Sequence, residues 1–397
     1  MKIAFLTFEY PSGGGYGTYV EHLALNLARK GHKVLVISQR RKYSAQRPAS
    51  EKGVDAWYFS ECDVPILRNL AYELKSNFAV NAAYKRFKFD VLHVNVPQGI
   101  SVPVFLKAAR RVATVHGLLR ELVKAVSRSF GSNDVEEDLQ VLFSPLLFAL
   151  EKSYVMRNDY FIAVSQWTKR ALQAHYNVPS DKISVVPAGV DTKKFRRVER
   201  AKEKLKSALG LRCDGKLVLF VGRFHGVKNP LLLVSLVPRL LEEEKELLFV
   251  FVGQGAKLRR KAEAALRAVP RRNYAFLDFV PHDVLPLLYS AADALVLTSV
   301  YENCPLVALE AMSCGTVVVA PKVGGVPEVV SHMESGLLYR ANDREELFKC
   351  LLSVLRKEVD VEGMGERARK IAVEKYDWSV VASQVEDVFQ KVASGDA

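Results

Sequence analysis

The chain has 397 residues, of which 49% are hydrophobic and 25% are charged, a composition that excludes a disordered chain and supplies enough apolar material for two domain cores. The formal net charge of +13 is unevenly distributed: residues 1–200 hold 30 Lys and Arg against 18 Asp and Glu, whereas residues 201–397 hold 27 against 26. The basic first half favours an anionic partner such as nucleic acid, a phospholipid surface or a phosphorylated ligand.

The cysteine pattern and the apolar runs predict the compartment. The five cysteines include no CxxC pair, so neither a disulfide framework nor a metal site is expected and a reducing cytoplasm fits; they are Cys62, Cys213, Cys304, Cys314 and Cys350. Residues 1–10 are typical of a first strand rather than a signal peptide. Because no run of 18 apolar residues occurs, we expect a cytoplasmic protein whose membrane contact, at the inner face, would be peripheral.

Short apolar runs alternate with helical patterns along the first half of the chain. A run at residues 2–7 is followed by a helical pattern at 19–31. Further strand-like runs lie at 33–38, 90–96, 111–117, 160–165 and 182–189. This alternation predicts a parallel sheet with helices on both faces.

The pattern stops at the polar, basic stretch 188–206 and then resumes. The second series of strand-like runs lies at 216–223, 246–253, 273–280, 294–299 and 316–322. We therefore predict an α/β fold of two doubly wound parallel-sheet, Rossmann-like domains facing each other across a cleft. The predicted domains are residues 1–187 and 188–375. Two placements remain open for a last helix in 376–397: it packs on the second domain, or it crosses back and packs on the first.

Ligands of parallel sheets bind beyond the carboxyl ends of strands, so the residues after each strand are the candidates. Four glycines lie between the first strand and its helix, where backbone amides approach an anion easily: Gly13, Gly14, Gly15 and Gly17. The alternative is an ordinary flexible loop. The spacing does not match a dinucleotide fingerprint, which disfavours NAD, while Arg40 and Arg41 leave NADP open.

His116 ends the strand-like run 111–117, on the side of the predicted cleft, where a catalytic role and a structural role remain equal alternatives. The segment 117–132 that follows has the pattern of an amphipathic helix. Its basic residues recur every four positions and its apolar residues gather elsewhere: Arg120, Lys124 and Arg128 against Leu119, Leu122, Val123, Val126 and Phe130. This pattern fits either a surface helix packed on its own domain or a helix lying on an anionic membrane.

The stretch VGRFHGVKNP follows the first strand of the second domain. It places Arg223 and Lys228 five residues apart, just before a helix that we expect to start near Asn229 and Pro230. Two cations held there would clamp a diphosphate. The alternative is a pair of solvated surface charges.

The stretch SVYENCPLVALEAM holds two glutamates with seven residues between them. Glu302 follows the strand-like run 294–299, and Glu310 lies one and a half turns into a helix whose first turn contains Pro305. Amides near Asn303, Cys304, Pro305 and Leu306 would face an anion at the helix start. A carboxylate also accepts hydrogen bonds from a sugar diol. The alternative is a capping acid and a partly buried helical glutamate.

Together these motifs resemble the nucleotide-sugar-dependent, retaining glycosyltransferases of the GT-B fold, known as glycosyltransferase group 1 or family 4. The resemblance covers nearly the whole chain. The motifs follow in family order: the glycine-rich loop, TVHG, AVS, VVPAGVD, VGRFHGVKN, FVGQG, SVYENCPLVALEAMSCG, VGGVPEVV and ESGLLY. The chain departs from the family at Ala188, where Asn is usual, and at Val280, where Gly is frequent.

The resemblance implies a role for each candidate residue. Arg223 and Lys228 would hold the diphosphate of the donor, and Glu310 would bind the ribose hydroxyls. Glu302 and the amides after it would lie at the transferred sugar, with His116 near the reaction centre. Gly14, Gly15 and Gly17 would close over the phosphates, while Phe279 and Val280 would lie near the base.

The expected reaction moves a hexosyl unit from a UDP- or GDP-linked sugar to an acceptor hydroxyl of a glycan, a lipid or a lipid-linked glycan. No DxD occurs in the chain, which agrees with catalysis that needs neither a metal nor another cofactor. Three alternatives remain: a glycoside hydrolase, which would not need the cation pair, a nucleotide-sugar epimerase on the same fold, and a soluble-acceptor transferase. A nucleic-acid-binding protein is disfavoured because no recognition motif is present.

Overall fold

The structure is a computed structural model that describes residues 1–11, 14–40, 50–51, 53–60, 68–95, 109–127 and 142–395. Its contacts divide the chain into two compact units. The first comprises Met1–Leu122, Leu142–Ala188 and Trp378–Ala397, and the second comprises Val123–Val141 and Gly189–Asp377. No helix of the described ranges is both long and apolar enough to span a bilayer.

The first unit is built on a sheet of eight strands in the order β3-β4-β2-β1-β5-β6-β7-β8. All neighbouring pairs are parallel except β3 and β4. The strands are β1 (Lys2–Thr7), β2 (Lys33–Arg40), β3 (Ser50–Glu51), β4 (Val54–Ser60), β5 (Val91–Asn95), β6 (Arg110–Val115), β7 (Tyr160–Ala163) and β8 (Ile183–Val185). The strand order reverses direction between β1 and β5, the position at which such sheets bind ligands.

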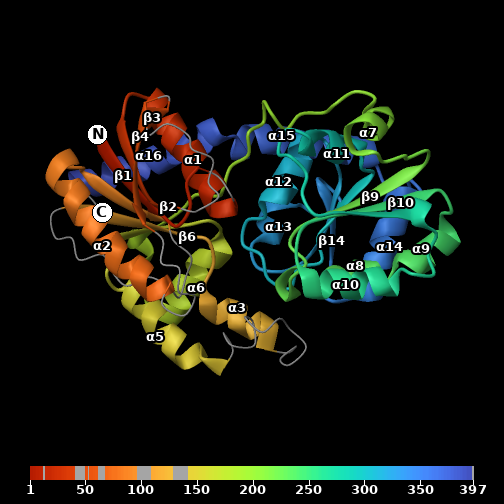
Figure 1. The fold of residues 1–397 in the computed structure, drawn as a ribbon, viewed down its shortest axis with the longest axis horizontal. Helices are drawn as coiled ribbons and strands as arrows, with labels where there is room; N and C mark the ends of the chain where they lie inside the picture. The colour runs from red at the N-terminus through yellow and green to blue at the C-terminus, as the bar shows by residue number, and fades with distance from the viewer. Residues whose placement is uncertain are drawn as a thin grey trace. The chain divides into compact units, whose positions relative to one another are not determined.

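Helices cover both faces of this sheet (Figure 1). They are α1 (Gly15–Arg29), α2 (Arg68–Phe87), α5 (Ser144–Val155), α6 (Gln166–Tyr176), the short η3 (Ser180–Lys182) and α16 (Trp378–Ser394). A further helix, α3 (Leu119–Val126), begins in the first unit and ends among residues of the second. The last helix is part of the first unit: the Phe389 ring packs on Phe5, and Glu386 pairs with Lys30 at 2.7 Å and with His32 at 2.6 Å.

The second unit has six parallel strands in the order β11-β10-β9-β12-β13-β14. They are β9 (Lys216–Val221), β10 (Leu247–Val252), β11 (Tyr274–Leu277), β12 (Ala294–Val296), β13 (Val318–Pro321) and β14 (Gly336–Tyr339). Every residue of β10 is buried, as expected for a parallel strand covered on both faces. The order reverses between β9 and β12, so the loops after these two strands define the expected ligand position.

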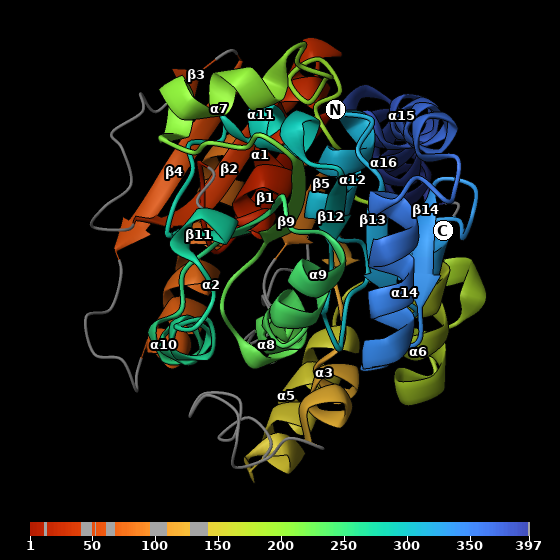
Figure 2. The same cartoon turned by 90° about the vertical axis from the view of Figure 1, so that its right-hand side faces the viewer.

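Two hydrophobic clusters, one on each face, hold the second unit together. Helices on the first face are α7 (Ala201–Leu209), α11 (Leu285–Ala291), α12 (Leu306–Ser313), α13 (Val326–Val329) and α15 (Val361–Tyr376). Helices on the second are α8 (Pro230–Val234), α9 (Val237–Glu243), α10 (Ala256–Ala265) and α14 (Arg344–Leu355), with the short η4 (Gly226–Lys228) and η5 (Arg271–Asn273) in loops. Figure 2 looks onto α14, which packs on β13 and β14.

Candidate functional site

In the second unit, Lys228 and Glu302 meet where the strand order reverses. Lys228 ends η4 after β9, and Glu302 lies in the loop after β12. The Lys228 ammonium donates to Oε1 of Glu302, which also accepts a 2.9 Å hydrogen bond from the Ser299 hydroxyl. Thr298 donates to the Lys228 carbonyl at 2.7 Å, which ties the two loops together. The pair is only partly shielded from solvent, so Lys228 keeps donors for a further anionic ligand.

The backbone of the Glu302 loop is fixed by a second glycine-containing loop. Gly325 donates its amide to the Glu302 carbonyl at 3.1 Å. The preceding Gly324 has φ +51, and a Cβ there would lie 1.8 Å from the same carbonyl oxygen. A side chain at residue 324 would therefore displace Glu302.

Arg223 is exposed beyond the end of β9, and its side chain makes no hydrogen bond or ion pair within the part of the chain that the structure describes. Its backbone is held, because the amide of Phe224 donates to the Gln254 carbonyl at 2.6 Å. Arg223 and Lys228 thus leave the same strand end, one unpaired and one paired with a carboxylate. A guanidinium in this setting is able to bind a phosphate in a bidentate geometry.

The start of α12 lies directly after Glu302. Pro305 is the extended N-cap residue, and no side chain caps the helix, so the amide of Leu306 points along the axis without an intrahelical partner. Asn303 is buried and Cys304 is half-buried. The end of the helix therefore offers partial positive charge next to Glu302.

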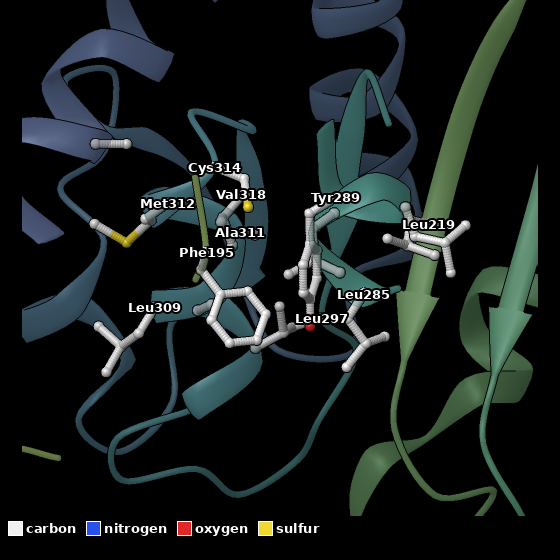
Figure 3. Packing of buried hydrophobic residues seen from close by; sticks show 14 of the residues in the cluster. Phe195, Leu219, Leu285, Tyr289, Leu297, Leu309, Ala311, Met312, Cys314 and Val318 are labelled. Carbon is white, nitrogen blue, oxygen red and sulfur yellow. The ribbon is translucent and has the colours of Figure 1, made fainter. Parts of the chain in front are cut away.

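Glu310, one turn further along α12, is almost fully buried. The Tyr289 hydroxyl of α11 donates to its Oε2 at 2.7 Å, and Nε2 of His282 lies 3.4 Å from its Oε1. Figure 3 shows Tyr289 among Leu285, Leu297 and Phe195, which enclose its ring. Burial and then the neighbouring Glu310 carboxylate raise the pKa of Tyr289 well above its usual value, so the hydroxyl remains a donor at neutral pH.

Phe279 and Val280 follow β11 and differ in exposure. The Phe279 side chain is 74% exposed, whereas Val280 is 5% exposed and belongs to a core cluster. The side chain of Val280 is therefore committed to packing, and only Phe279 presents a ring surface to a ligand.

In the first unit, His116 lies after β6 in a hydrogen-bonded chain. Asn95, the last residue of β5, donates from Nδ2 to the Tyr16 carbonyl at 3.3 Å, which turns its Oδ1 toward His116 Nε2 at 2.6 Å. Since that oxygen only accepts, His116 carries its proton on Nε2. The rings of Tyr16 and Tyr19 pack edge-on against it.

His116 is neutral in this environment. Although the residue keeps some solvent exposure, desolvation of the ring lowers the pKa of His116 to about 3. A neutral imidazole can orient a hydroxyl by a hydrogen bond, but it adds no positive charge to the site.

The glycine-rich loop places three of its predicted residues at the start of α1, while Gly13 lies outside the described residues. Gly14 is the N-cap, Gly15 begins the helix, and the amide of the buried Gly17 points to Oε1 of Glu9 at 3.4 Å. A Cβ at Gly14 would lie 2.6 Å from the same oxygen. The position at this helix start that we predicted for a phosphate is thus held by the carboxylate of Glu9, which the sequence did not single out.

The basic helix predicted at 117–132 is observed as α3 (Leu119–Val126), while Arg128 and Phe130 lie outside the described residues. Its apolar residues Leu119, Val123 and Val126 are buried. Arg120 does not extend into solvent either, because its guanidinium lies over the Phe148 ring at 4.9 Å. The described part of the helix therefore fits the first of the two alternatives, a helix whose apolar side packs on the protein, and among the residues of α3 only Lys124 is exposed.

Among the described residues, no group of three or more His, Cys, Asp or Glu side chains is arranged to hold a metal ion. Five functional candidates were missed by sequence reasoning: Glu9, Asn95, His282, Tyr289 and Ser299. Asn95 follows a strand at the point where the strand order reverses, which is a signal that could have found it. Tyr289 stands in an apolar helical run and gave no such signal.

Comparisons with known proteins agree with this architecture. The family model of the group 1 glycosyl transferases matches residues 201–371, and that of glycosyltransferase family 4 matches residues 13–194. An uncharacterized glycosyltransferase of Methanocaldococcus jannaschii is 28% identical over 98% of both chains. A D-inositol 3-phosphate glycosyltransferase of Corynebacterium efficiens is 27% identical over 96% of this chain and 92% of its own.

Solved structures show the same fold. Sucrose-phosphate synthase from Thermosynechococcus elongatus superposes with a TM-score of 0.83 at 22% identity over 99% of both chains. Anabaena HepE in complex with UDP-glucose gives a TM-score of 0.74 at 20% identity, over 98% of this chain and 100% of that one. The two family models, taken with these full-length similarities, confirm the GT-B fold and the enzyme class predicted from the sequence motifs. The chain belongs to the group 1, family 4 glycosyltransferases.

Proposed function

We propose that this glycosyltransferase moves a hexosyl unit from a UDP- or GDP-linked sugar to a hydroxyl of a lipid or lipid-linked glycan, with retention of the anomeric configuration. The observation that carries the proposal is the meeting of Lys228, Glu302 and the uncapped start of α12 at the point where the strand order reverses. A diphosphate placed there would contact two cations and the amide of Leu306. The structural relative solved with UDP-glucose supports this class of donor.

The residues of the second unit account for the departure of the leaving group. As the bond from the anomeric carbon to the diphosphate oxygen breaks, its electron pair remains on that oxygen. Arg223, Lys228 and the helix start would stabilise the charge that develops there. The acceptor hydroxyl oxygen forms the new bond to the same carbon, and its proton passes to the departing diphosphate.

These groups supply the positive charge that a metal ion would otherwise provide, so we propose that transfer needs no divalent cation. We also propose a cytoplasmic enzyme that works at the inner face of a membrane. The basic first half of the chain supports the membrane contact. The inositol-phosphate enzyme among the relatives indicates that a soluble acceptor must be included in any test.

Release of nucleoside diphosphate from UDP- and GDP-sugars, with and without acceptor, tests the proposal. We expect release that depends on a lipid-linked acceptor, that is unchanged by EDTA, and whose product keeps the donor's anomeric configuration by NMR. Sugar interconversion without transfer would indicate an epimerase, and cleavage of a glycan without nucleotide a hydrolase. Activity that EDTA abolishes and Mg²⁺ restores would contradict metal independence, and turnover of soluble acceptors alone would contradict the lipid acceptor.

A further inference from the structure

One side of α5, together with the residues that flank it at both ends, exposes a row of large apolar side chains. Leu142, Leu146 and Leu150 recur every four residues, and Phe143 and Met156 extend the row; all five are exposed, Leu146 by 61%. Residues four apart on a helix share a side, so these form one surface, here called the α5 apolar face. From 142 to 156 it is about 21 Å long at 1.5 Å per residue. Figures 1 and 2 both show α5 in yellow at the lower edge of its unit.

The opposite side of α5 fixes the helix in the first unit. Glu151, Tyr154 and Val155 are buried there. Glu151 Oε1 accepts the amide of Leu119 at 2.7 Å, and its other oxygen accepts the hydroxyl of Tyr176. Because both carboxylate oxygens are engaged within the core, α5 cannot rotate to bury its leucines.

The composition of α5 is that of a helix covered on both sides. Apart from Glu151 and Lys152 the helix SPLLFALEKSYV has no charged residue, a pattern typical of a buried helix. A contiguous apolar surface of this kind marks a contact with another molecule or with a membrane.

The net positive charge of the first unit favours an anionic membrane as the partner of this face. The residues of the first unit include 24 Lys and Arg against 15 Asp and Glu. The charged residue of α5 that is exposed is Lys152, since Glu151 lies inside. A second copy of the chain, with its net charge of +13, would repel the basic first unit, whereas an anionic bilayer brings the opposite charge and an apolar interior.

We propose that the α5 apolar face binds the surface of an anionic phospholipid bilayer, with its leucines and Phe143 inserted among the acyl chains. This deepens the proposed function by naming the surface that brings the enzyme to a lipid acceptor. It replaces α3, whose apolar side is buried, as the membrane contact. Binding to the bilayer combines insertion of the apolar side chains with attraction between the basic first unit and the anionic headgroups. Because salt screens this attraction, binding weakens as the salt concentration rises.

Flotation with vesicles of phosphatidylcholine, with and without phosphatidylglycerol, tests this surface. The variant is Leu142→Ser/Leu146→Ser, because these two side chains are 63% and 61% exposed and the fold depends little on them. We expect wild type to bind the anionic vesicles preferentially and the variant to lose at least about tenfold in partition, because two apolar side chains no longer insert. Val373→Ser on α15 and Leu74→Ser on α2 are matched exposed controls and should bind like wild type.

Several outcomes would overturn the proposal. These are equal binding of the double variant and wild type, no preference for anionic vesicles, or an equal loss in Leu74→Ser. A wild-type dimer in sedimentation that the double variant converts to a monomer would show instead that the face joins two copies. Calorimetry with UDP and GDP separates this result from the proposed function: nucleotide binding should be unchanged in the double variant, and its absence in wild type would count against the donor site alone.

Discussion

The hydroxyl of Tyr289 donates a 2.7 Å hydrogen bond to Oε2 of Glu310, and this bond fixes the orientation of the one carboxylate on α12. The other oxygen, Oε1, lies 3.4 Å from His282. A carboxylate held on one oxygen presents the remaining lone pairs in a defined direction, which suits two neighbouring hydroxyls of a ribose. Helix α11 therefore orients the carboxylate on α12 that we propose as the ribose-binding group.

Replacing Tyr289 by Phe should weaken binding of free UDP or GDP by roughly three- to tenfold and lower the free energy of unfolding by about 1–2 kcal/mol, since Glu310 loses its donor. Calorimetry and urea unfolding measure the two effects. Tyr339→Phe is the matched control: its buried hydroxyl donates to the Leu297 carbonyl at 2.8 Å. This control should lose stability and keep nucleotide affinity, and equal affinity losses in both variants would contradict a role for Tyr289 in binding.

Removing either cation after β9 should slow transfer. For Lys228→Ala and for Arg223→Ala we expect kcat/KM to fall about ten- to hundredfold, because one charge-assisted contact to the leaving diphosphate contributes about 1.5–3 kcal/mol. Lys202→Ala serves as control, since Lys202 pairs with Asp293 at 2.7 Å elsewhere in the same unit. Wild-type rates in both test variants would remove the cation pair from the mechanism.

Replacing each of the two glutamates of the α12 segment should change a different quantity, nucleotide affinity for one and kcat for the other. Glu310→Gln should weaken binding of the free nucleoside diphosphate, because the nearly buried Glu310 carboxylate is oriented by the hydrogen bond from Tyr289. Glu302→Gln should lower kcat with little change in that affinity, because Glu302 stands in the loop and holds Lys228. The measurements are calorimetry with UDP and GDP, and steady-state rates. Affinity losses of equal size would argue against two distinct roles.

Asn95→Asp should create a pH dependence that wild type lacks. Burial holds the pKa of His116 at about 3, so wild-type His116 is neutral from pH 5 to 9 and its titration does not affect the rate there. A carboxylate at Asn95 Oδ1, 2.6 Å from Nε2, favours the imidazolium and raises the pKa of His116. Activity should then be low in acid and recover as pH rises through the new pKa. Rate–pH profiles check this, with Asn81→Asp on α2 as the charge-matched control; parallel profiles for both variants would contradict it.

Much of the second unit was predictable because its determinants are local. A six-residue apolar run such as β10 predicts a buried parallel strand, and Pro305 marks the helix that follows Glu302. Two strands that are neighbours at the reversal of strand order bring Lys228 and Glu302 together, although 74 residues separate them. The sequence spacing and the fold class were together sufficient to predict that these two side chains would lie near each other.

What was not predictable depends on packing between distant helices. Spacing of four residues correctly grouped Arg120 with Lys124, but it carried no information about Phe148, whose ring covers the guanidinium. Glu9 was unremarkable in sequence because its place at the start of α1 depends on how the loop folds back. The four-residue pattern predicts which residues share a helix face, and tertiary contacts decide whether that face meets water.

The position of α16 in the first unit has a consequence for synthesis. The described residues from Gly189 to Asp377 follow one another without interruption in the second unit, whereas the first unit lacks the helix that covers Phe5 and His93 until residues 378–394 have been made. Domains fold as units while the chain emerges. The first unit, whose sheet is translated first, therefore lacks part of its cover until α16 has been made. The second unit has all the residues of its own sheet before that point.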